Sequence, residues 1–147
     1  MIGPTFLRSG LPGVVLGACV MFASPALAET ISFKADLKAG EAVPPNDSKG
    51  TGTVTATYDT ASKKLTWKGN YSGLSGPATM AHFHGPAEPG KNAGVAVPIT
   101  PSTSPFENSA NLTDAQAADL LAGRWYVNVH TAAHPGGEIR GQLVKGM

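Results

Sequence analysis

The arrangement of apolar residues is the feature that most limits how this chain can fold. In 31–37 (ISFKADL) apolar and polar residues alternate. The same period of two returns in six further segments: 52–59, 64–74, 79–85, 94–99, 124–131 and 137–144. Successive side chains of a strand point to opposite faces, so the alternation predicts about seven short strands, each with one buried face. Turn residues separate the segments, and this spacing indicates an all-β sandwich or barrel.

Two other kinds of segment interrupt the strands. The stretch 111–123 (NLTDAQAADLLAG) carries helix signals: Thr113 as N-cap, Gln116 at the capping-box position and Gly123 after the end. It predicts one short helix over about 113–122. The stretches 84–94 and 100–111 are rich in Pro, Gly and Ser and predict long loops.

The first 28 residues have the pattern of a secretory signal peptide. A basic residue, Arg8, precedes an apolar stretch that ends in Ala-Leu-Ala at 26–28. Residues 29–147 then form a single exported domain, periplasmic or extracellular, that is not an integral membrane protein. An alternative is lipid attachment at Cys19 within LGAC. Removing Arg8 leaves 11 − 1 = 10 basic residues against 10 acidic ones, so the charge predicts no nucleic-acid partner.

All four histidines lie in two similar segments, 81–90 (AHFHGPAEPG) and 127–136 (VNVHTAAHPG). In each segment a histidine is followed by four residues and then Pro-Gly. The similarity suggests two equivalent strand ends whose histidines meet at one end of the sandwich. Each strand has its apolar residues on one face, and His82, His84 and His130 fall on the opposite face.

Three imidazoles on polar strand faces predict a metal site, with a solvated polar surface as the simpler alternative. Side chains at i and i+2 of a strand start about 6.5–7 Å apart, close enough for His82 and His84 to converge on one ion. His130 would be the third ligand. His134, in the following loop, is a candidate fourth ligand or a residue in water.

Cysteine-based zinc sites are excluded because Cys19 leaves with the signal peptide, and calcium requires more oxygens than this cluster offers. Imidazoles suit copper, with zinc as the alternative. Met80 lies on the same strand face, where its thioether would either favour Cu(I) or simply pack. A three-histidine copper site open to solvent permits one-electron chemistry on a small oxidant such as superoxide.

Glu138 and Arg140 share one face of the segment 137–144. If this strand forms a hairpin with 124–131, Glu138 would orient the free ring nitrogen of His130. Arg140 would draw an anion toward the site. The simpler interpretation is an exposed Glu–Arg pair on the sheet surface. No serine elbow, no mature cysteine nucleophile and no phosphate-binding glycine loop occurs in the sequence.

The segments 80–99 (MAHFHGPAEPGKNAGVAVPI) and 123–143 (GRWYVNVHTAAHPGGEIRGQL) resemble the CHRD domain, a module named from chordin that also occurs singly in exported bacterial proteins. The resemblance covers about 30–145. It implies an immunoglobulin-like or Greek-key antiparallel β-sandwich of seven to eight strands in an extracytoplasmic setting. Some members are thought to hold copper and to act like copper-only superoxide dismutases, which carries the ligand role to His82, His84 and His130, with His134 as a fourth.

Two other functions fit the same residues. A metal-free sandwich could serve as an adhesion or interaction module that presents its loops or an edge strand. Alternatively, a zinc or copper ion could only stabilise the fold. The distances between the ring nitrogens of the three histidines distinguish the metal-free module from a shared metal site.

Overall fold

The computed structural model describes residues 3, 10, 13, 17–24 and 26–146. Over these residues the fold is all-β, as predicted, with nine strands, one α-helix and one short 3-10 helix. The strands are β1 (Thr30–Lys38), β2 (Thr51–Asp59), β3 (Lys64–Ser72), β4 (Ala78–His84), β5 (Val95–Pro98), β6 (Phe106–Asn111), β7 (Tyr126–Thr131), β8 (Ile139–Gln142) and β9 (Val144–Lys145). The helices are η1 (Ala39–Glu41) and α1 (Asp114–Leu121).

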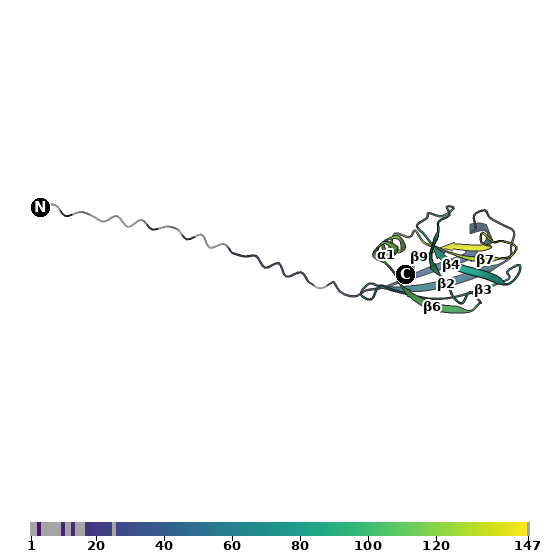
Figure 1. Cartoon of the computed structure of the whole chain (residues 1–147), viewed down its shortest axis with the longest axis horizontal. Coiled ribbons are helices and arrows are strands. Elements are labelled where there is room, and N and C mark those ends of the chain that lie inside the picture. Colours follow the sequence, from purple (N-terminus) through teal and green to yellow (C-terminus); the bar gives the residue numbers. More distant parts are fainter. Residues whose placement is uncertain (1–2, 4–9, 11–12, 14–16, 25, 147) are drawn as a thin grey trace.

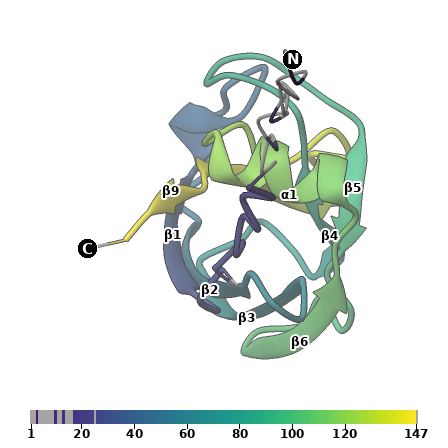
Figure 2. The same ribbon diagram turned by 90° about the vertical axis from the view of Figure 1, so that its left-hand side faces the viewer.

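The strands form one antiparallel sheet that curls until it is nearly closed, in the order β5-β4-β7-β8-β1-β2-β3-β6, with β9 beside β1. Figure 1 shows the strands side by side in one body, and Figure 2 looks along them. The curl brings β3 against β4, where the rings of Trp67 and Phe83 meet edge to face at 5.1 Å. Apolar residues of both halves therefore share one core, as in a sandwich.

The helix forms where its capping residues predict it. The Thr113 side chain accepts a hydrogen bond from the backbone N–H of Gln116, and the Gln116 side chain accepts one from the Thr113 backbone. These two bonds satisfy N–H groups that a helix start would otherwise leave without partners. Leu120 is fully buried, which fixes α1 across one end of the curled sheet (Figure 2).

The prediction of a loop over 100–111 is wrong in its second half. Residues 106–111 form the edge strand β6, which pairs with β3 from Lys64 to Gly69. Only Phe106 of this strand is buried. Its ring occupies the space beside Gly69, where any Cβ would overlap it. One buried aromatic opposite a glycine therefore holds a strand that otherwise has a polar sequence.

The prediction of a signal peptide over 1–28 falls partly on residues outside the described part of the chain. The described residues 17–24 and 26–29 have no helix or strand, and the thiol of Cys19 is exposed. Within the described residues, no helix is long and apolar enough to cross a membrane.

Candidate metal centre

The histidines lie on one face of the β4–β7 ladder. Across this ladder Met80 pairs with His130, His82 with Asn128, and His84 with Tyr126. Because the strands are antiparallel, the two similar histidine segments do not end at the same edge, contrary to the sequence interpretation. His84 and His130 instead lie diagonally across the ladder, with His82 between them.

The polar face of this ladder is covered. Its outward side chains were predicted to point away from the apolar core, and they do, yet His84 is 8 % and His130 is 6 % exposed. The loop 85–94 contacts His84 and the loop 132–137 contacts His130. His82 is only partly exposed. The alternative of a solvated polar surface is therefore wrong for His84 and His130.

The three histidines converge. One ring nitrogen from each of His82, His84 and His130 lies within 4.8 Å of the others. Nδ1 of His82 is 3.2 Å from Nε2 of His130. Two nitrogens bound to one ion at ~2.0–2.1 Å are about 3.3–4.2 Å apart. Small side-chain rotations would therefore bring all three nitrogens to bonding distance of a shared ion.

Backbone carbonyls fix which nitrogen carries the proton on two of the rings. Nδ1 of His84 lies 3.0 Å from the carbonyl oxygen of Ala93, and Nδ1 of His130 lies 2.9 Å from that of Pro135. A carbonyl only accepts, so each Nδ1 carries the proton and each Nε2 keeps its lone pair. Nε2 of His84 is buried and has no hydrogen-bond partner among the described residues. Such an orphaned lone pair fits a metal ligand.

The site favours neutral imidazoles. Burial is the main cause that lowers the pKa of both His82 and His84 below the usual value of 6.5. The neighbouring His130 lowers both pKa values further. Metal ions bind neutral imidazole, so the same burial that discourages protonation keeps these ligands available near neutral pH.

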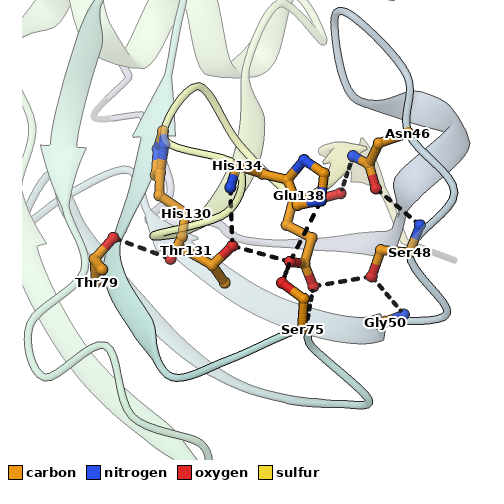
Figure 3. A network of polar contacts seen from close by, with 9 residues as sticks. All are labelled: Asn46, Ser48, Gly50, Ser75, Thr79, His130, Thr131, His134 and Glu138. Atoms are coloured by element: carbon orange, nitrogen blue, oxygen red, sulfur yellow. Dashed lines mark hydrogen bonds and ion pairs between the residues drawn. The ribbon is translucent and has the colours of Figure 1, made fainter.

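His134 lies outside the triad. Its Nε2 is 3.9 Å from a carboxylate oxygen of Glu138, and its side chain is one-third exposed. Figure 3 shows its ring turned toward Glu138 and away from the ring of His130. The structure therefore gives the candidate fourth ligand a different neighbour, and the convergent set is His82, His84 and His130.

Glu138 is the centre of a buried hydrogen-bond network (Figure 3). Its side chain is fully buried and accepts from the hydroxyls of Ser48, Ser75 and Thr131 and from the backbone N–H of Ser75. Burial would raise the pKa of Glu138, but these donors lower it below its ordinary value. The β7–β8 hairpin forms as predicted, yet the expected role of Glu138 is wrong, because Pro135 orients His130.

Arg140 is buried as well, so the prediction of an exposed Glu138–Arg140 pair is wrong. Only 2 % of Arg140 is exposed. Its guanidinium lies 3.5 Å from the ring centre of Tyr126 and donates to the Lys91 carbonyl at 2.6 Å and to Oδ1 of Asn92 at 3.1 Å. These contacts leave Arg140 poorly placed to meet an incoming anion.

Sequence reasoning missed four groups that shape the site: the carbonyls of Ala93 and Pro135 and the side chains of Tyr126 and Asn128. The amide of Asn128 donates to the Gly136 carbonyl. It also fills the space beside Gly137, whose φ of +124° suits glycine. Tyr126 and Asn128 were visible on the polar face of β7, but only burial of that face gives them a role.

The match to known proteins agrees with this fold. A family model, the CHRD domain, matches residues 33–143. The chain belongs to the CHRD family. No curated protein and no solved structure matches it. The matched region of this CHRD domain includes His82, His84 and His130, so the triad lies inside the domain and not in an appended segment.

Proposed function

We propose that this CHRD domain is an exported protein that binds a copper ion through His82, His84 and His130. The observation that carries the proposal is the buried Nε2 of His84, which has a lone pair fixed by the Ala93 carbonyl and no hydrogen-bond partner among the described residues. One ring nitrogen of each of His82, His84 and His130 lies within 4.8 Å of the other two.

The ligand chemistry favours copper over other ions. Among the residues that the structure describes, no cysteine or carboxylate joins the convergent group. A site made only of imidazoles suits copper and zinc, and copper binds more tightly to a given set of nitrogen ligands. Zinc remains the competitor, because three histidines also hold zinc in catalytic sites. A competition titration between the two metals therefore tests the identity of the ion.

The position of the triad argues against an ion that only stabilises the fold. All three ligands come from β4 and β7, which already pair through six residue positions. An ion here links strands that are neighbours without it, so it adds little constraint to the chain. Sites that stabilise folding usually supply contacts that the apo chain lacks.

The three-histidine set would leave a coordination position open. His82 is the most exposed of the three, and no carbonyl of the described residues contacts its ring, so it is the side on which a small molecule would enter. Bound copper would supply one-electron exchange with an oxidant such as superoxide. The chain's own contribution is to hold two neutral imidazoles rigidly and to exclude bulk water from their inner side.

Export is part of the proposal. The apolar segment ending at Ala28 precedes β1 directly, and CHRD domains are generally extracellular. Cleavage after Ala28 would leave Glu29 as the first residue of the domain, in keeping with a signal peptide. N-terminal sequencing of the protein recovered from its native compartment tests this point. An N-terminus at Met1 would contradict export, and a lipidated Cys19 would contradict cleavage after Ala28.

The copper proposal is tested by metal analysis and by activity. We expect one Cu(II) per chain in the purified protein, lost in His130→Ala, and a superoxide dismutation rate of the copper-loaded protein well above that of the apo protein. Because Arg140 is buried, we expect that rate to depend little on salt. Metal content unchanged in His130→Ala would contradict the site, and a rate no higher than that of the apo protein would contradict the activity.

A further inference from the structure

Arg140 and Tyr126 form a stack behind His84. The ring of Tyr126 lies parallel to the imidazole of His84, with centroids 4.9 Å apart and 3° between the planes. The guanidinium of Arg140 covers the other side of the same tyrosine at 3.5 Å. The three groups come from adjacent strands, β4, β7 and β8. His84 is the cross-strand partner of Tyr126, whereas Arg140 pairs with Asn128, two residues along β7 from Tyr126.

The same two residues hold the loop that orients His84. The Tyr126 hydroxyl accepts from the backbone N–H of Ala93 at 3.0 Å and donates to the Ala93 carbonyl at 3.2 Å. Arg140 donates to the carbonyl of Lys91 and to the side chain of Asn92, the two residues just before Ala93. Three consecutive residues are therefore fixed by one stack.

The carbonyl of Ala93 has both of its lone pairs in use. One accepts from Nδ1 of His84 at 3.0 Å, and the other accepts from Tyr126. A carbonyl held in this way sets both the tautomer and the ring orientation of His84. If the loop moved, His84 would lose its Nδ1 partner, and its Nε2 would no longer be fixed as the free nitrogen.

We propose that Arg140 and Tyr126 are positioning residues for the metal centre, acting through the Ala93 carbonyl to hold His84 in its ligand tautomer. This inference rests on the proposed copper site. It gives Arg140 the role of positioning His84, in place of the attraction of an anion. Both residues are at most 2 % exposed, so their contacts are made inside the protein.

The test uses Tyr126→Phe, which keeps the aromatic stack and removes only the hydroxyl, and Arg140→Lys, which keeps the charge and loses the planar fork. The matched control is Tyr71→Phe, because the Tyr71 hydroxyl donates to the Ser102 carbonyl at 2.8 Å, outside the histidine face. Each protein is measured twice, by ¹⁵N NMR of the histidine tautomers without metal and by Cu(II) competition titration.

We expect Tyr126→Phe and Arg140→Lys to raise the population of His84 with a free Nδ1, to leave His130 unchanged, and to weaken copper binding about 10–100-fold. Tyr71→Phe should lower the melting temperature comparably and change neither readout. A wild-type His84 tautomer and wild-type affinity in Tyr126→Phe would overturn the inference, even if Arg140→Lys failed to fold. Failure of the wild-type protein to bind copper would instead overturn the proposed function, while the tautomer measurement would still decide the role of the stack.

Discussion

The loops 85–94 and 132–137 each orient one histidine ring, and each lies next to a buried charge of opposite sign. Each presents one backbone carbonyl, from Ala93 or Pro135, to the Nδ1 of a histidine. The first loop is held by a buried cation, Arg140. The second lies beside a buried carboxylate, Glu138, which accepts from Thr131 just before the loop and is 3.9 Å from His134 within it.

The two buried side chains differ in how directly they contact the loops. Arg140 donates hydrogen bonds to the two residues before Ala93. Glu138 accepts one from Thr131, just before the second loop, and others from Ser48 and Ser75. We infer that Arg140 serves mainly the metal centre and that Glu138 serves mainly stability. Only Ile139 separates the two residues, so Glu138, which directly precedes β8, and Arg140, within β8, support the two loops from neighbouring positions.

Removing a metal-binding histidine should cause the largest loss of copper affinity. The loss should be equal for His84 and His130. We expect His84→Ala and His130→Ala each to weaken copper binding by more than the ~10–100-fold typical of an outer partner, because each removes a metal bond. Isothermal or competition titration measures this. Retention of copper by either variant would show that its loop does not belong to the site.

Glu138→Gln should separate stability from binding. The amide replaces a carboxylate that accepts at least four hydrogen bonds in a fully buried position. Hydrogen bonds to charged groups contribute about 1.5–3 kcal/mol each, so we expect a loss of at least ~2 kcal/mol in urea unfolding. Copper affinity of the folded variant should fall less than in Arg140→Lys. The reverse order would contradict the division of roles.

The pH dependence of stability should show His84 and Glu138 in different pH windows. The folded pKa of His84 lies below 6.5, so the unfolded chain binds the proton first, and stability falls as pH drops from about 6.5. The folded pKa of Glu138 lies below 4.5, so its contribution is present above pH 4.5 and is lost as pH falls further. We expect His84→Gln to flatten the first decline and Glu138→Gln the second. One shared decline in both variants would contradict separate supports.

His134→Ala should have the smallest effect. Its ring is one-third exposed and 3.9 Å from Glu138, beyond hydrogen-bond distance. An ion pair of this kind contributes between 0 and about 1 kcal/mol, and the residue is outside the convergent triad. Unfolding and copper titration should therefore both stay close to wild type. A tenfold loss of copper affinity would return His134 to the site as a fourth ligand.

Much of the fold follows from local sequence. Alternation in 31–37 and 52–59 is enough to define β1 and β2, and Thr113 with Gln116 defines the start of α1. The strand β6 could not be predicted, because FENSAN has no alternation and owes its place to Phe106 packing beside Gly69 in another strand. Such a long-range contact has no local signal.

The convergence of the three histidines was predictable and its supports were not. The spacing of His82 and His84 places both on one strand face, and the similar segment supplies His130. Burial of that face depends on how the loops 85–94 and 132–137 fold back over it, which no periodicity encodes. For this reason Arg140 and Glu138 were interpreted as surface charges, whereas both lie inside the protein.

The most direct test of the account is a competition titration of Cu(II) at neutral pH on the purified protein, beside a variant in which His82, His84 and His130 are all replaced by alanine. The account predicts one tightly bound copper per chain in the wild type, preferred over zinc, and none in the variant. Equal copper content in the two proteins, or no copper in the wild type, would contradict it.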